Sequence, residues 1–251
     1  MTTSEFSVEF DTLYNNVKSQ SAPGLDEYEK SVFLTKAQEE LIKNYFNPTS
    51  NKLQQGFDDS AKRQMDFAEI LRTINIVADV PTPGTYISID ERAQIFLLPN
   101  DTWIVSNEQV TVTDGVTPYL VTVVPLNYKE YDRLMTKPYK EPVKRQAWRL
   151  SQGNSVTPVT ANGQRSISEI ITKSGTTVSR YVVRYVKKPQ PIILDGLTAW
   201  GLSINGVTAI SECELNPIIH REILDRAVEL AKLAYEDGSL QSTVQLNQRN
   251  E

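Results

Sequence analysis

The chain has 251 residues, of which 39% are hydrophobic, which is enough to bury a core in one large domain or two small ones. Its formal net charge of −5 and pI of about 5.2 argue against a protein that coats nucleic acid. A single cysteine, Cys213, excludes an internal disulfide and fits a reducing compartment.

No segment of the sequence has the properties of a membrane anchor or a secretion signal. No apolar run approaches the roughly 20 residues that a membrane-spanning helix needs. The N-terminal sequence MTTSEFSVEF is polar and acidic, without the basic and apolar regions of a signal peptide. We therefore expect synthesis in a cytoplasm and no membrane partner.

The first quarter of the chain is predicted to be helical. Residues 26–46 place Phe33, Ala37, Leu41 and Tyr45 four apart on one face. A second helix is predicted over 58–78, where apolar residues again follow the helical period. A polar loop separates the two segments, so together they indicate a helical hairpin.

The region from 85 to 213 reads as antiparallel β-structure with one short helix near 127–136. Asp114-Gly115 and Asn205-Gly206 are the turn signals that we expect to join hairpin strands. The β-rich runs are 86–89, 95–98, 103–106, 110–113, 119–124, 167–172, 178–186, 202–204 and 207–210.

The last helix is predicted over 216–236, with Asn216 as its N-cap and Pro217 at its first position. It carries two apolar stripes, one of which includes Leu224, Val228 and Tyr235. A helix in a lone domain usually needs one stripe. The second stripe therefore indicates either a contact with another subunit or a helix sandwiched inside its own domain.

These elements predict an α+β fold with three segments. Residues 1–80 form an N-terminal helical region, 81–215 a β-rich module with the short inserted helix, and 216–251 the C-terminal helix and a flexible tail. We expect the three to form one integrated structural unit.

The residues offer little that resembles a catalytic or metal site. With one histidine, His220, and one cysteine, the chain has too few soft ligands for a classical zinc site. Glu212 and Glu214 flank Cys213 and would share one face of a strand, but no aromatic-rich walls surround them. No phosphate-binding glycine loop occurs. We therefore predict no enzymatic activity, no cofactor and no metal.

A basic segment runs from Lys137 to Arg149. It holds five basic residues against one acidic residue and includes two aromatic residues. Such a segment binds either nucleic-acid phosphates or an acidic neighbouring subunit, for example one presenting Asp26, Glu27 and Glu29. We favour the protein partner. The candidate contact residues are Lys144, Arg145, Trp148 and Arg149.

The tail after Gly238 is polar apart from Leu240, Val244 and Leu246. Three apolar residues do not support a fold alone. We interpret the tail as an arm that docks on a neighbouring subunit through Val244 and Leu246, the alternative being a disordered end that contacts nothing.

Four strings resemble the virion structural proteins of crAss-like tailed phages of gut bacteria, in order from about residue 9 to 235. They are EFDTLYNNVKSQSAPGLDEYEKSVFLTKAQEELIKNYF, VVPLNYKEYDRLMTKPYKEPVKRQAWRL, RYVKKPQPIIL and CELNPIIHREILDRAVELAKLAY. The loops around 99–118 and 151–165 depart from the family.

The resemblance implies a ring in the head-to-tail connector, beneath the portal and in twelve copies. The partners that it implies are further copies of the chain, the portal and other connector or tail ring proteins, with DNA only as cargo. The location that it implies is the virion, and it supplies no catalytic residues.

Two other functions compete with a connector ring. One is a tail-associated module that binds a glycan or receptor, a class that shows exposed aromatics on its sugar-facing loops. The other is a phage glycan hydrolase, which a single histidine and the lack of a paired motif argue against.

Overall fold

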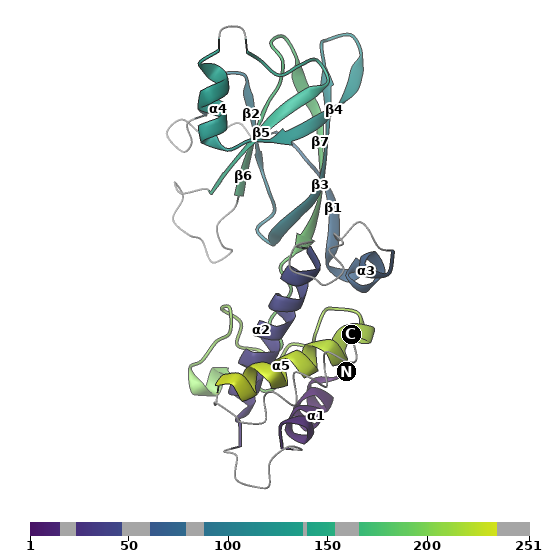
Figure 1. Ribbon diagram of the computed structural model, residues 1–251, viewed down its shortest axis with the longest axis vertical. Coiled ribbons are helices and arrows are strands. Elements are labelled where there is room, and N and C mark those ends of the chain that lie inside the picture. The colour runs from purple at the N-terminus through teal and green to yellow at the C-terminus, as the bar shows by residue number, and fades with distance from the viewer. Residues whose placement is uncertain (16–23, 47–60, 79–87, 138–139, 154–165, 235–251) are drawn as a thin grey trace. The chain divides into compact units, whose positions relative to one another are not determined.

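The computed structural model describes residues 1–15, 24–46, 61–78, 88–137, 140–153 and 166–234 (Figure 1). The chain forms two compact units. The helical unit comprises Met1–Ile70 and Pro189–Glu251, and the sheet unit comprises Leu71–Lys188. Helices and a curled sheet together confirm the α+β class.

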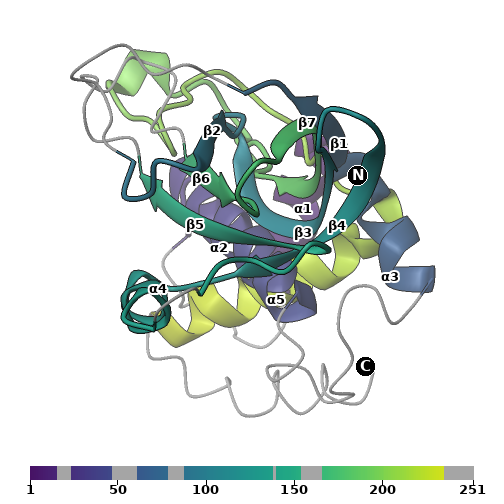
Figure 2. The ribbon, with the colours of Figure 1, turned by 90° about the horizontal axis from the view of Figure 1, so that it is seen from above.

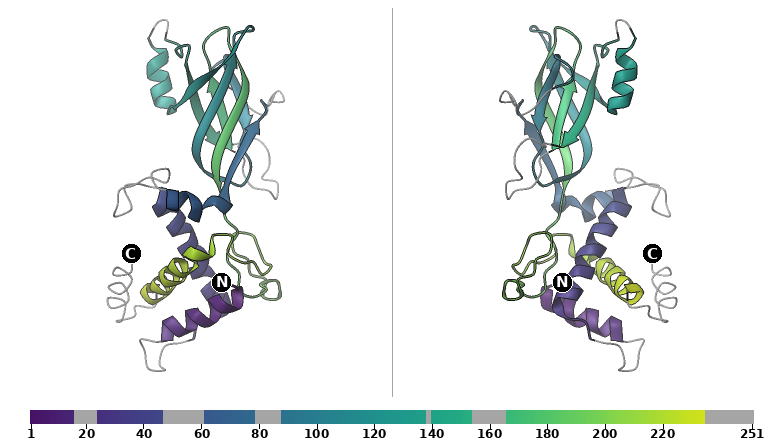
Figure 3. Two further views of the ribbon diagram at one scale, coloured as in Figure 1. Left: turned by 90° about the vertical axis from the view of Figure 1, so that its right-hand side faces the viewer. Right: turned by 90° about the vertical axis from the view of Figure 1, so that its left-hand side faces the viewer.

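The core of the helical unit is formed by α1 (Thr3–Asn15), α2 (Glu27–Phe46) and α5 (His220–Ala234). Helix α5 contacts both α1 and α2, and Figure 3 shows the three helices together. The apolar side chains that they bury include Phe6, Phe10, Leu34, Ile42 and Ile223. Asn216 caps the 3₁₀ turn before α5 (Pro217–Ile219), as predicted, since its side chain accepts a hydrogen bond from the Ile218 amide at 3.1 Å.

Polar side chains of α2 bind the extended segment 190–194, which follows the sheet unit in the chain. The Leu194 amide donates to Ser31 Oγ at 3.0 Å, and the Ile192 amide donates to Thr35 Oγ1 at 3.1 Å. Gln38 Nε2 donates to the Gln190 carbonyl at 3.0 Å. The three side chains occur at helical spacing and their partners alternate along the segment. Helix α2 therefore satisfies backbone groups that a neighbouring strand would satisfy in a sheet.

The sheet unit is a seven-stranded sheet of order β1-β7-β3-β4-β5-β6-β2, and it is strongly curled (Figure 2). Five of the six strand pairs are antiparallel, and β4 and β5 are parallel. The strands are β1 (Leu71–Ile76), β2 (Ala93–Leu97), β3 (Thr102–Thr113), β4 (Pro118–Pro125), β5 (Gln146–Gly153), β6 (Ser166–Ile171) and β7 (Thr177–Lys187).

The inner face of the curled sheet holds the main core of this unit. Tyr181, Val183, Val110, Phe96 and Ile170 are buried there. The Phe96 and Tyr181 rings meet edge to face, with centroids 4.8 Å apart. The curl also brings β2 close to β7, although the two strands are not neighbours in the sheet order. A hydrogen bond from the Val178 amide of β7 to Gln94 Oε1 of β2 joins them.

Helix α4 (Tyr128–Met135) covers part of the outer face, where Tyr131 packs with Trp148, Leu150 and Ile171. The Tyr131 hydroxyl also donates to Asp90 Oδ2 at 2.9 Å, and Arg92 lies 2.6 Å from the same oxygen. Burial alone would raise the pKa of Asp90, but the bonds from Arg92 and Tyr131 outweigh it and leave that pKa low.

The predicted helix over 58–78 is wrong beyond Asp66. The described part consists of α3 (Ala61–Asp66), a 3₁₀ turn (Ala68–Ile70) and then strand β1. The β-branched residues of LRTINI pair with β7, in a register that matches Ile74 to Val183. Tertiary pairing therefore overrides the helical spacing of Ile70 and Ile74, and the predicted helical hairpin is wrong as well.

The β-region contains one feature that the antiparallel prediction did not allow. Strands β4 and β5 pair in parallel, and α4 lies in the connection between them. A parallel pair needs such a crossover, so the predicted helix near 127–136 and the missed strand β5 are two parts of one motif.

Several predicted β-runs also differ in extent. The runs 103–106 and 110–113 form the single strand β3, and the runs 202–204 and 207–210 make only an isolated bridge. Of the run 86–89, residues 86 and 87 lie outside the described residues, and Ser88 and Ile89 form no strand.

Both predicted hairpin turns are confirmed. Gly115 has φ +90° in the β3–β4 turn, and Asn205 and Gly206 have φ of 51° and 81° between the bridged residues Ile204 and Val207. Two successive positive φ values are those of the turn that Asn-Gly favours.

Candidate subunit-contact surfaces

Three connections meet at one end of the sheet. They are the β3–β4 turn (114–117), the segment 140–145 that leads into β5, and the β6–β7 turn (172–176). The register aligns them, since Thr113 lies opposite both Pro118 and Thr177, and Thr122 lies opposite Gln146. The chain enters and leaves the unit at the other end, where Leu71 pairs with Val186.

Hydrogen bonds hold the segment 140–145 against the β6–β7 turn. Glu141 Oε2 accepts from the Ser174 hydroxyl at 2.8 Å and from the Ser174 amide at 3.2 Å. These bonds, with the nearby charges of Lys173 and Arg92, lower the pKa of Glu141. The Lys144 ammonium lies 5.4 Å from the centroid of the Tyr119 ring. The segment is therefore an ordered part of the surface.

The exposed charged side chains of this end are mostly basic, with Asp114 of the β3–β4 turn as an exposed carboxylate among them. Lys140, Lys144, Arg145 and Lys173 are all exposed, and we call these four residues the basic end. Beside them, Val116 is 87% exposed and Val143 65% exposed. Apolar groups surrounded by a polar rim are a common arrangement at protein–protein interfaces.

The structure divides the four residues predicted from the basic segment into two pairs. Lys144 and Arg145 are exposed. Trp148 is buried against α4. Arg149 lies opposite Ile170 on the inner face, where its Nη1 is 2.7 Å from Glu108 Oε1. Strand alternation explains the division, because successive residues of β5 point to opposite faces and both of its faces are covered at Trp148 and Arg149.

The structure describes two of the three interface residues that were predicted on the last helix. Leu224 and Val228 are buried in the core of the helical unit, so the described residues of the chain itself cover this stripe. For these two residues, the burial corresponds to the second of the two alternatives given for the stripes, a helix sandwiched inside its own domain. Tyr235, Val244 and Leu246 lie outside the described residues.

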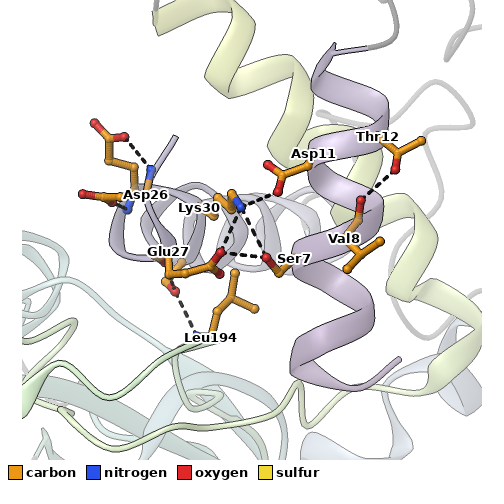
Figure 4. Close-up of polar contacts among 10 residues, drawn as sticks. Ser7, Val8, Asp11, Thr12, Asp26, Glu27, Lys30 and Leu194 are labelled. Atoms are coloured by element: carbon orange, nitrogen blue, oxygen red, sulfur yellow. Dashed lines mark hydrogen bonds and ion pairs between the residues drawn. The ribbon is translucent and has the colours of Figure 1, made fainter. Parts of the chain in front are cut away.

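The helical unit carries an acidic patch formed by Glu5, Glu9 and Asp11 of α1 and by Asp26 just before α2. Helix α1 contains no basic residue, and Val8 is 66% exposed on it. Figure 4 shows Asp11 and Asp26 near Lys30, the basic residue drawn there.

Lys30 is too deeply buried to neutralise the acidic patch from outside. Its side chain is only 4% exposed, and Nζ lies 2.7 Å from Asp11 and 3.0 Å from Glu27. Ser7 Oγ lies 3.3 Å from the same nitrogen and donates to Glu27, so these bonds join α1 to α2 (Figure 4). Lys30 therefore stabilises the contact between the two helices and pairs with one member of the acidic patch, Asp11.

Trp200 is an exposed aromatic residue of the helical unit. It lies in a 3₁₀ turn (Thr198–Trp200) and is 75% exposed. The segment 196–211 around it contains no charged residue, and Ile210 is 57% exposed. An exposed tryptophan is a common anchor of binding surfaces. The lack of charge over this segment is the sequence signal that would have indicated the patch.

The residues examined for catalysis occupy structural positions. His220 Nε2 bonds to the Leu215 carbonyl at 2.8 Å, and burial lowers the pKa of the imidazole. Burial raises the pKa of Cys213 to about 11, which disfavours the reactive thiolate. Across the part of the chain that the structure describes, no group of three or more His, Cys, Asp or Glu is placed to hold a metal.

None of the helices described is long and apolar enough to cross a membrane.

Comparison with known proteins defines the class. Residues 1–243 match the model of the phage tail ring protein 3/4 family, and the chain belongs to that family. It is 50% identical to "Ring protein 4/5" of Bacteroides phage crAss001 over 253 residues, which cover all of both chains. It is 34% identical to "Ring protein 3" of the same phage over 235 residues, covering 92% of this chain and 95% of the relative. The resemblance to virion proteins of crAss-like phages is confirmed.

Proposed function

We propose that the chain is a structural subunit of a ring in the virion of a crAss-like phage, equivalent to ring protein 4/5 of crAss001. The observation that carries this proposal is the end-to-end identity of 50%, against 34% for ring protein 3. Identity over the whole length covers both units of the chain and supports the same kind of assembly for the two proteins.

The ring that we propose lies in the head-to-tail connector below the portal and contains twelve copies. Its partners are further copies of the chain, the portal and other ring proteins, and DNA passes through it as cargo. We propose no catalytic activity and no cofactor. The structural placement of His220 and Cys213 supports this assignment.

Two surfaces are proposed to join the subunits. One is the exposed half of the basic segment, Lys144 and Arg145, in contact with an acidic neighbour. The other is the C-terminal end of the chain, with Tyr235 from the second stripe of the last helix and with Val244 and Leu246 of the tail as docking residues. An arm of this kind gains affinity by repetition around a ring, because the adjoining helix holds it at high effective concentration.

The test is the mass of the assembled chain. Light scattering coupled to size exclusion measures it for the chain alone and for the chain co-expressed with the portal and ring proteins of its own phage. A ring mass that also includes the portal supports the proposal. A monomer that joins neither its own copies nor those proteins overturns it.

One observation favours a second candidate, a tail-associated module that binds a glycan or receptor. Trp200 is 75% exposed on an uncharged loop, and aromatic faces of this kind bind sugars. A glycan array compares the two candidates directly, with the Trp200→Ala variant as control. Glycan binding by the original chain that disappears in the Trp200→Ala variant would support the second candidate.

A further inference from the structure

The two units of the chain carry opposite charge. The helical unit has 21 acidic and 11 basic residues, a net charge of −10. The sheet unit has 10 acidic and 15 basic residues, a net charge of +5. The formal charge of −5 for the whole chain hides this division.

Each unit also presents its charge on an identifiable surface. On the sheet unit it is the basic end, where the carboxylate Glu141 is bonded to Ser174 and the carboxylate Asp114 accepts from the Val116 and Thr117 amides. On the helical unit it is the acidic patch of α1 and Asp26, in which Asp11 pairs with the buried Lys30. Each surface includes an exposed valine, Val143 on the basic end and Val8 on the acidic patch. The two surfaces are therefore complementary in both charge and apolar character.

We propose that the basic end of one copy docks on the acidic patch of the next copy, in a contact that repeats around the ring. The proposal rests on the proposed ring function and identifies the two surfaces that the ring brings together. A closed ring needs such a head-to-tail contact, in which each subunit offers two different patches. The charges select and orient the neighbour, and the valines supply the apolar centre of the contact.

Charge reversal at each surface separately tests this pairing. The first variant carries Lys144→Glu and Arg145→Glu on the basic end. The second carries Glu5→Lys and Glu9→Lys, which lie one helical turn apart on α1. The control carries Lys129→Glu and Arg133→Glu on exposed positions of α4, with the same change in net charge as the first variant. Thermal unfolding checks that all three are folded.

Each reversed variant alone should need at least about tenfold more protein for half-assembly at low salt, because every contact then joins like charges. An equimolar mixture of the two should restore assembly, since the reversed basic end of one variant faces the reversed acidic patch of the other. The control should assemble like the original chain. Raising the salt should reduce the defect of each single variant. Ring mass is measured by light scattering, with the virion partners of the phage present.

Three results would overturn the pairing. They are normal rings from either variant alone, no recovery in the mixture, and a defect in the control equal to that of the first variant. Loss of DNA binding by the first variant with intact rings would assign the basic end to DNA instead. If the original chain forms no ring under any of these conditions, the proposed function itself fails, and the pairing that rests on it fails with it.

Discussion

Arg149 and Glu108 form an ion pair on the inner face of the curled sheet, with Arg149 Nη1 2.7 Å from Glu108 Oε1. The pair joins β5 to β3 on either side of β4. The Tyr181 hydroxyl donates to the same carboxylate oxygen at 2.6 Å. Burial first, and then the Glu108 charge, raise the pKa of Tyr181. A residue that the sequence offered for subunit contact thus holds the sheet together.

Replacing Arg149 by Met should destabilise the isolated chain by about 3 kcal/mol, because Glu108 would remain in the sheet without its cation. The double variant Arg149→Met/Glu108→Leu should recover part of that loss, since it leaves no buried charge unpaired. Urea unfolding of the single and double variants measures both effects. Lys144→Ala, at an exposed position, serves as control and should change stability by no more than about 0.5 kcal/mol. An equally small loss for Arg149→Met would show that the pair is not structural.

The polar contacts of α2 should contribute to stability as strongly as its apolar ones. Thr35→Val keeps the shape of the side chain but leaves the buried Ile192 amide without its acceptor, at a cost of about 1–3 kcal/mol. Thr12→Val on α1 removes an exposed hydroxyl that bonds to the Val8 carbonyl, and it should have little effect. Chemical denaturation of the two variants gives the comparison. Equal effects would mean that water replaces the Thr35 hydroxyl.

His220 should make stability depend on pH near neutrality. Burial lowers the pKa of His220 in the folded chain, while its unfolded value stays near 6.5. Between these two values the unfolded chain binds the proton more readily, so stability falls as pH decreases below about 6.5 and is fully present above it. His220→Gln should remove this part of the slope. Urea unfolding from about pH 7.5 to about pH 5 measures it. Identical slopes in the two proteins would show that other groups cause the dependence.

Deleting residues 239–251 should separate folding from assembly. Ordering each residue costs about 1–2 kcal/mol, and burying Val244 and Leu246 returns about 1.5–3 kcal/mol each, so the arm alone binds weakly. The thermal midpoint of the isolated subunit should therefore stay nearly unchanged, while incorporation into particles falls. The Val244→Ser/Leu246→Ser variant should reproduce the defect at full length. A truncated chain that enters particles as well as the full chain would exclude an arm.

The sequence predicted those parts of the fold that local chemistry determines. Asn205-Gly206 requires positive φ, and Asn216-Pro217 starts a helix by capping, so both features are in place. Strand β1 was missed because Ile70 and Ile74 also fit a helical period, and only the distant strand β7 decides between the two structures. Strand β5 was missed because the basic residues that precede it suggested a surface segment, whereas Arg149 within it turns inward to a carboxylate 41 positions earlier in the chain.

The candidate surfaces were predictable only in part, for a similar reason. Lys144 and Arg145 precede β5 and are exposed, whereas Trp148 and Arg149 belong to the strand and are covered. Periodicity likewise grouped Phe33 and Leu41 on one apolar face of α2, but both are only half-buried, and the buried face instead includes Ser31 and Gln38. These polar residues are buried because a segment more than 150 positions away supplies their partners. No local pattern identifies such partners.

The discontinuity of the helical unit bears on how the protein is made. A ribosome completes residues 71–188 before it reaches segment 190–194, so the sheet unit is the first to possess all of its own residues. Ser31, Thr35 and Gln38 of α2 obtain their backbone partners only after the last quarter of the chain has been synthesised. Helix α1 likewise obtains its contact with α5 only at that stage. A chain that is terminated early therefore keeps its basic end but lacks a finished acidic patch. By the docking proposed above, such a fragment would engage only one neighbour, and a ring that incorporated it would stop growing at that position.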